Sequence, residues 1–118
     1  MKTVIALLVI LGTTQAWSCE EIKGKYNCGG NKISFYYETR ADGVKLLTGS
    51  GETMIMDGQP HDLGMGMIYQ VHCTPKVLQI DMDNNGIIAI QKFMYRDART
   101  LDAEITLDGA TRVLVCRK

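Results

Sequence analysis

The sequence predicts an all-β fold, most simply a small antiparallel up-and-down barrel of about eight short strands, with a β-sandwich as the alternative. Apolar and polar residues alternate along most of the chain after residue 18, as they do in half-buried strands. Turn-forming sequences divide the alternating runs at near-regular intervals. The barrel is favoured because strands joined by tight turns pair with their sequence neighbours, and closure then removes exposed edges.

The alternating runs define the expected strands in chain order. We expect strands at residues 32–39, 44–48, 53–56, 65–73, 77–82, 87–96, 101–107 and 111–116. The run 101–107 has the clearest alternation: Leu101 and Ile105 belong to one face, whereas Asp102 and Glu104 belong to the other. This run predicts a strand with one face toward the core and the other toward solvent.

Turn sequences between these runs predict tight hairpins. Asn85-Gly86 and Asp108-Gly109 each separate two alternating runs, and both dipeptides readily adopt the positive φ that two-residue hairpin turns require. Residues 61–64 lack alternation and are expected to form a loop.

The first eighteen residues have the pattern of a secretory signal peptide. Lys2 precedes an apolar run at residues 4–11, and small residues follow up to Ser18. The run is too short to span a bilayer, which needs about 20 apolar residues. Cleavage is expected before Cys19 or before Trp17. We therefore expect a signal peptide at 1–18, a single β-rich domain at 19–118, and a secreted or periplasmic protein.

The cysteines are candidates for disulfides. An even number of cysteines, Cys19, Cys28, Cys73 and Cys116, in a small exported chain suggests two bridges. Sequence alone leaves every pairing open, and we favour Cys19–Cys28 with Cys73–Cys116. The alternative of a lipoprotein acylated at Cys19 would leave an odd number of thiols, and bulky Trp17 does not suit its cleavage site. No Cys-x-x-Cys pair supports a zinc site.

Two sets of residues are candidate metal ligands. Asp81, Asp83 and Asn85 match the first half of a calcium-binding EF-hand loop, but Lys92 stands where its bidentate glutamate should be. A plain hairpin is the favoured interpretation of this segment.

The second set is rich in methionine. Met54, Met56, Met65 and Met67, with His61 between them, offer the soft ligands that reduced copper prefers. Methionines also fill irregular space in cores, and this interpretation is favoured. An interior lined by methionine and isoleucine could equally hold a small apolar ligand.

No catalytic residue or cofactor is expected. His72 and Cys73 are adjacent in an expected strand, so their side chains point to opposite faces and cannot form a nucleophile–base pair. Ser50 lies in a Gly-Ser-Gly sequence without the nucleophile-elbow pattern. The sequence favours a non-enzymatic role, although it does not exclude an enzyme.

The charge balance gives no indication of nucleic acid as a partner. Residues 19–118 keep all thirteen acidic residues and lose only Lys2 of the thirteen basic ones, so their formal net charge is −1. Nucleic acid and anionic membrane surfaces call for a basic excess. No second apolar stretch is long enough to span a membrane with a helix.

A short motif near the start of the domain is similar to one in lipocalins. Gly24-Lys25-Tyr26 resembles the glycine, any residue, tryptophan sequence with which lipocalin-type barrels open, with tyrosine in place of tryptophan. The resemblance covers these three residues, and we base no family assignment on it. It would imply that Tyr26 plugs one end of a barrel.

Taken together, the sequence predicts an exported β-domain that acts as a non-enzymatic binding or interaction module, with a protein or a small apolar molecule as its partner. The loop around His61 and the turn at 81–85 are the favoured contact regions, because loops on a rigid scaffold often carry function. Binding of copper or calcium, and a purely structural role in the cell envelope, are the alternatives.

Overall fold

A computed structural model describes residues 19–49 and 52–118, and it confirms an all-β antiparallel barrel. The predicted signal peptide at 1–18 and Ser50 lie outside the described residues. The strands are β1 (Gly24–Cys28), β2 (Asn31–Thr39), β3 (Lys45–Gly49), β4 (Glu52–Ile55), β5 (His61–Gly64), β6 (Met67–Thr74), β7 (Val77–Asn84), β8 (Ile87–Asp97), β9 (Thr100–Leu107) and β10 (Ala110–Arg117). None of the helical segments in this part of the chain has the length and apolarity to cross a membrane.

The structure has two strands beyond the eight expected from alternation, β1 and β5. Strand β5 occupies residues 61–64, where a loop was expected, and that expectation is wrong. His61 pairs with Tyr69 and Asp62 pairs with Ile68, so this polar segment is a strand because β6 offers a hydrogen-bonding edge. Its own residues carry no alternation that could have revealed it.

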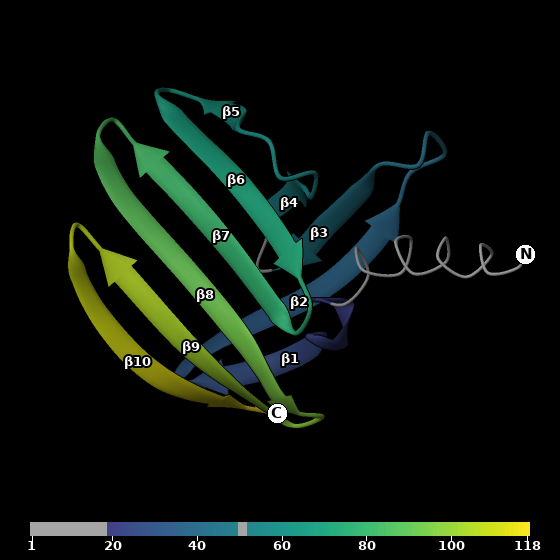
Figure 1. Ribbon diagram of the computed structural model, residues 1–118, viewed down its shortest axis with the longest axis vertical. Coiled ribbons are helices and arrows are strands. Elements are labelled where there is room, and N and C mark those ends of the chain that lie inside the picture. The colour runs from purple at the N-terminus through teal and green to yellow at the C-terminus, as the bar shows by residue number, and fades with distance from the viewer. Residues whose placement is uncertain (1–18, 50–51) are drawn as a thin grey trace, which may run out of the picture.

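The strands form one continuous sheet that curls almost into a closed barrel. Their order is β4-β3-β2-β1-β10-β9-β8-β7-β6-β5, so strands β1 and β10 pair although they lie at opposite ends of the domain. In Figure 1 strands β5–β10 form one curved sheet and β1–β4 cross behind it. The edge strands β4 and β5 are consecutive in sequence but do not pair with each other.

Hydrogen bonds partly bridge the seam beside strand β4. The backbone N–H of Ile55 donates to the hydroxyl of Tyr69 on β6 (2.9 Å). The N–H of Gly58 donates to the carbonyl of Val71 (3.1 Å), and the side-chain amide of Gln70 donates to the carbonyl of Gly58 (2.6 Å). These bonds hold β4 and the following residues against β6 without a regular strand ladder.

The two hairpin turns predicted from sequence are present. Asn85 and Gly86 have φ angles of 53° and 96°, and Asp108 and Gly109 have φ angles of 50° and 89°. Positive φ at both central residues matches the twist of the flanking strands. The predicted alternation of strand 101–107 is also confirmed, because Leu101 is fully buried while its neighbour Asp102 lies on the outer face.

The core is the inner face of the barrel. Its buried hydrophobic residues are Cys19, Ile22, Tyr26, Cys28, Phe35, Leu47, Met54, Tyr69, Val71, Leu78, Ile80, Phe93, Leu101, Ala103 and Cys116. Phe35 and Phe93 pack edge to face near the middle, with ring centroids 4.9 Å apart. Tyr26, in the lipocalin-like motif, is 2% exposed and its ring lies 6.0 Å from that of Phe35.

Both disulfides differ from the favoured pairing, which is therefore wrong. The bridges are Cys19–Cys73 and Cys28–Cys116. The pairing of β1 with β10 places Cys28 directly opposite Cys116, with 4.1 Å between their Cα atoms. Closeness in sequence suggested the first bridge, but extended strand β1 carries Cys28 away from Cys19.

One end of the barrel is covered by the residues that precede β1. We call residues 19–23 the plug segment and the end that it covers the closed end. Cys19 and Ile22 are fully buried there, and the hydroxyl of Tyr37 on β2 donates to the carbonyls of Cys19 and Ile22. Lys45 forms an ion pair with Glu20 (2.6 Å). The plug segment is thus attached to β2 and β3, and through a disulfide to β6.

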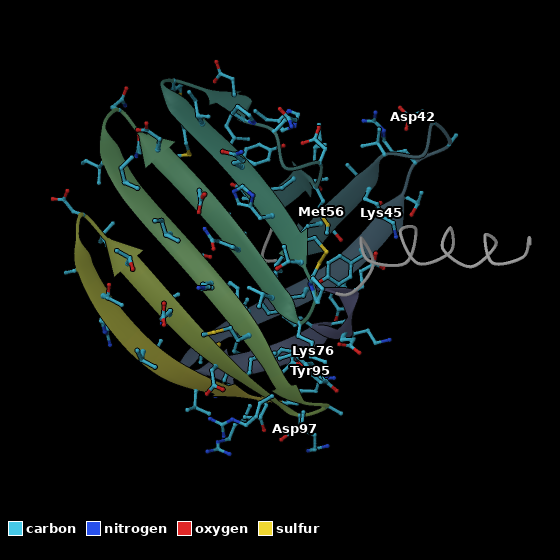
Figure 2. The ribbon with its side chains drawn as sticks, in the orientation of Figure 1. Asp42, Lys45, Met56, Lys76, Tyr95 and Asp97 are labelled. Atoms are coloured by element: carbon cyan, nitrogen blue, oxygen red, sulfur yellow. A yellow bond between two sulfur atoms is a disulfide. The ribbon has the colours of Figure 1, made fainter. Side chains whose placement is uncertain are left out.

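Other groups at the closed end cap aromatic rings. Lys76, in the β6–β7 turn, places its ammonium 5.1 Å from the centre of the Tyr95 ring, and Figure 2 shows the two side chains together. The ammonium of Lys118 lies 5.3 Å from the ring centre of Tyr26. We call the opposite end, with the β7–β8 and β9–β10 turns, the open end.

Candidate functional site

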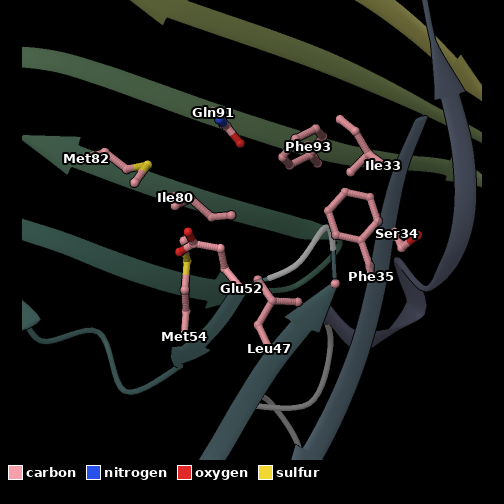
Figure 3. A pocket seen from close by; sticks show the side chains of 11 residues that line it. Ile33, Ser34, Phe35, Leu47, Glu52, Met54, Ile80, Met82, Gln91 and Phe93 are labelled. Carbon is pink, nitrogen blue, oxygen red and sulfur yellow. The ribbon is translucent and has the colours of Figure 1, made fainter. Parts of the chain in front are cut away.

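A cavity of about 220 Å³ lies inside the barrel, between strands β2–β4 and strands β7–β8. It is lined by Ile33, Ser34, Phe35, Leu47, Gly49, Glu52, Met54, Ile80, Met82, Gln91 and Phe93. Figure 3 shows these side chains converging from the two walls of the barrel. The lining is mostly aliphatic, aromatic and thioether, as in sites for small organic ligands.

Strand register explains why these side chains line one space. Ile80 and Met82 occupy alternate inward positions of β7, opposite Gln91 and Ala89 on β8. Met54 is directly opposite Leu47 across the β3–β4 pair. Because inward residues on neighbouring strands stand side by side, the two walls present a continuous apolar surface.

Gly49 permits a close approach of two backbones beside the cavity. Its φ is 152°, and a Cβ atom at this position would lie 2.0 Å from the carbonyl oxygen of Ser34 on β2. Any larger residue would therefore push β3 away from β2. A glycine is required here if the wall formed by β2 and β3 is to stay intact.

Besides Ser34, two polar side chains interrupt the apolar lining. Gln91 lies on the inner face of β8, between Ala89 and Phe93 in the alternation, and Glu52 lies on the same face of β4 as Met54. Among residues 19–49 and 52–118, neither side chain takes part in a hydrogen bond or ion pair. A polar group on an apolar face, free of protein partners, is available to orient a ligand.

The methionine set proposed for copper is divided among three places. Met54 lines the cavity, whereas Met56 lines a surface depression near His72 on the β6 side of the seam. Met65 and Met67 line a groove at the open end. Copper binding by the whole set stays a prediction, and this placement does not favour it.

His61, the imidazole of that set, is engaged elsewhere. Its Nε2 lies 2.8 Å from a carboxylate oxygen of Asp57, and its ring stacks on Tyr69 with centroids 5.4 Å apart. The hydrogen bond from His61 holds the pKa of Asp57 below its usual value, and the backbone N–H of Gln59 adds to this effect. The pair therefore helps to fix the segment that crosses the seam.

The oxygens of the EF-hand-like turn bond to their own hairpins. Asp81 accepts from Gln79 (2.9 Å) and contacts His72 (3.0 Å) on the outer face. Asp83 accepts from the N–H of Gly86 (2.8 Å), as expected of a turn residue. The described part of the chain contains no cluster of three or more histidine, cysteine, aspartate or glutamate side chains that could hold a metal. Calcium binding there stays a prediction.

The remaining candidates show no catalytic arrangement. Cys73 is in a disulfide, and the neighbouring His72 lies on the outer face, where its contact is Asp81. At the closed end, burial, assisted by the charge of Glu20, raises the pKa of the Tyr37 hydroxyl above its ordinary value. Tyr37 consequently acts as a neutral hydrogen-bond donor to the plug segment.

Sequence reasoning missed Glu52, Gln91, Phe35 and Phe93 as site residues. A signal was present in two cases, since Gln91 interrupts an apolar face of its strand and Glu52 shares its face with Met54 and Met56. Whether such residues face a cavity or solvent depends on which strands lie opposite. Alternation within one strand does not contain that information.

The fold and cavity define this chain as a nearly closed, ten-stranded antiparallel barrel with an accessible interior. Comparison with solved structures finds a similar barrel in the crystal structure of a mutant of the fluorescent protein UnaG, with a TM-score of 0.58 and 12% sequence identity. The match covers 84% of this chain and 96% of that chain. At this identity the similarity concerns the fold alone. No protein family and no curated protein sequence match the chain.

Proposed function

We propose that this protein is an exported, non-enzymatic carrier that binds a small, mainly apolar molecule in the barrel cavity. The observation that carries the proposal is the cavity of about 220 Å³, with an apolar lining and two polar side chains that no described residue engages. A purely structural protein predicts a filled interior, so the cavity favours the binding role. The two disulfides support export, because such bridges persist in oxidising compartments.

The volume sets the size of the ligand. An engineered apolar cavity of about 150 Å³ accepts benzene. A space of 220 Å³ therefore suits a single ring with substituents or a folded chain of moderate length. A longer ligand can extend from the cavity toward the open end.

The expected affinity is modest for a short linear probe. Each buried CH₂ group contributes about 0.8 kcal/mol, and association costs several kcal/mol of lost freedom. For 1-octanol we expect a dissociation constant of about 0.1–1 mM. A physiological ligand that fills the cavity more completely would bind more tightly.

The test measures binding of 1-octanol by isothermal titration calorimetry to the protein and to two matched variants. Met82→Trp places a large ring in the cavity and should weaken octanol binding at least about tenfold. Met94→Trp makes the same change on the outer face of β8 and should leave binding unchanged. Thermal unfolding shows that both variants are folded. Equal octanol affinity in both variants, or none in the unmodified protein, would contradict the proposal.

A further inference from the structure

Among the described residues that line the cavity, one has an acidic or basic side chain, the acidic residue Glu52. Glu52 lies at the start of β4, toward the open end, and Figure 3 shows it beside Met54 on the cavity side of the strand. It also lines the adjoining groove with Leu63 and Met67. Glu52 therefore stands where a ligand would pass between the cavity and solvent.

The basic side chains of the described residues lie elsewhere. Among the described residues that line the cavity there is no lysine, arginine or histidine. Lys76 and Lys118 cap aromatic rings at the closed end, and Lys45 is paired with Glu20 there. No ion pair of the described residues involves Glu52, so its charge is not neutralised by the protein.

Arg112 shares an inward cross-strand row with Gln91 and is separated from it by Ile105. It occupies an inward position of β10, opposite Ile105, but it is exposed and does not line the cavity. An anionic end at the mouth of the cavity would face the carboxylate of Glu52, and no basic side chain among the described lining residues would neutralise it. Glu52 is exposed, so solvent weakens the repulsion between its carboxylate and an anionic group but does not remove it at low salt.

We infer that the ligand is a cationic amphiphile, an apolar body that ends in a protonated amine. This inference rests on the proposed function. The ammonium donates charge-assisted hydrogen bonds to the carboxylate of Glu52, which are stronger than bonds between neutral groups. The amide oxygen of Gln91 can accept a further bond from a polar group on the body. The apolar part packs against Ile80, Met82 and Phe93.

The experiment compares three probes with the same eight-carbon chain: octylammonium, 1-octanol and octanoate. Calorimetric titrations at pH 7 and low salt use the full protein, the variant Glu52→Gln, and the control Glu38→Gln. Glu38 is exposed on the outer face of β2, so the control removes the same charge far from the cavity. Thermal unfolding verifies that each variant is folded.

The expected result is that octylammonium binds at least about tenfold more tightly than octanoate, with octanol between them. Glu52→Gln should remove most of this preference while keeping octanol binding, and Glu38→Gln should preserve it. Equal binding of the three probes, or a preference that survives Glu52→Gln, overturns the cationic ligand but leaves the carrier function standing. A preference for octanoate that Arg112→Gln abolishes also overturns the cationic ligand and leaves the carrier function standing. Binding of none of the probes refutes the proposed function and this inference with it.

Discussion

The closed end and the cavity of this barrel are built from the same strands, but the polar groups of the plug segment and those of the cavity differ in whether they are bonded within the protein. At the closed end the plug segment is bonded to its neighbours. The carbonyl of Ile22 accepts a hydrogen bond from the hydroxyl of Tyr37, and Glu20 forms an ion pair with Lys45. In the cavity Gln91 and Glu52 have no such partners among the described residues. Gln91 is half-buried and Glu52 is exposed, so water reaches both side chains and their lack of protein partners destabilises the fold little. The difference teaches that the bonds of the plug segment serve stability, whereas the cavity leaves polar side chains available to a ligand. The closed end is not bonded throughout, because the buried hydroxyl of Tyr26 has no hydrogen-bond partner among the described residues.

The largest expected effect comes from the disulfide that anchors the plug segment. Replacing Cys19 and Cys73 together by serine opens a loop that spans 54 residues. The chain-entropy estimate for such a loop is about 4 kcal/mol of unfolding free energy. We also expect amide hydrogen exchange at Ile22 to accelerate, because the plug segment then opens locally. Urea unfolding and hydrogen exchange measure the two effects.

The second bridge is the matched control for that prediction. Replacing Cys28 and Cys116 by serine should lower the unfolding free energy by a similar amount, about 4 kcal/mol. It should leave exchange at Ile22 slow, because β1 and β10 remain hydrogen-bonded and the plug segment keeps its own bridge. If Ile22 exchanges equally fast in both double variants, the Cys19–Cys73 bridge does not hold the plug segment in place.

A smaller loss is expected when the plug segment loses one hydrogen-bond donor. Tyr37→Phe removes the hydroxyl that donates to the carbonyls of Cys19 and Ile22. The carbonyl of Cys19 still accepts from the N–H of Ile22, but the carbonyl of Ile22 loses this donor. We expect a loss of about 1–3 kcal/mol in chemical denaturation. Tyr36→Phe, on the outer face, should change stability by less than about 0.5 kcal/mol, and equal losses would disprove the role of Tyr37.

Removing a polar side chain from the cavity should change the unfolding free energy only slightly. Gln91→Leu removes a polar side chain that no described residue bonds, so we expect the unfolding free energy to stay within about 1 kcal/mol or to rise. The control Gln79→Leu removes an amide that donates to Asp81 on the outer face, and it should be destabilising. A loss for Gln91→Leu as large as that for Tyr37→Phe would erase the proposed difference between the two ends.

The smallest expected effect concerns the seam that joins the two walls. The pKa of Asp57 is lowered in the folded state. Its carboxylate therefore stabilises the fold at pH values above the pKa of aspartate in the unfolded chain, about 4. That contribution is lost as the pH falls through the lowered pKa. The difference in melting temperature between the protein and Asp57→Asn should therefore narrow between about pH 5 and pH 2. Glu38→Gln controls for the loss of one negative charge, and a gap that widens in acid would contradict the assignment.

Several features of the fold could be read from the chain itself. Turn chemistry at Asn85-Gly86 and Asp108-Gly109 and the alternation of β9 predicted their hairpins, because these preferences act between residues that are close in sequence. The all-β class and the up-and-down barrel followed from the same local rules. Strand β5 did not, because its residues carry no strand pattern of their own and depend on β6 for pairing.

The candidate site was only partly accessible from sequence. An apolar interior able to hold a ligand was among the hypotheses, but its residues could not be chosen. Met54 was named as a candidate for copper, whereas it lines the cavity, and Glu52 and Gln91 were not named at all. The turn at 81–85 and His61 were favoured as contact regions, yet their side chains mainly bond within the hairpins and the seam.

By itself the sequence determined the local conformations: which segments extend, where they reverse, and which face of each strand is apolar. It also determined that four cysteines were available for crosslinking. Only the tertiary structure decided the pairing of β1 with β10, and with it the Cys28–Cys116 bridge, the seam at β4 and the cavity between β2–β4 and β7–β8. The physical reason is that backbone preferences act over a few residues, whereas barrel closure and a shared cavity depend on contacts between distant segments.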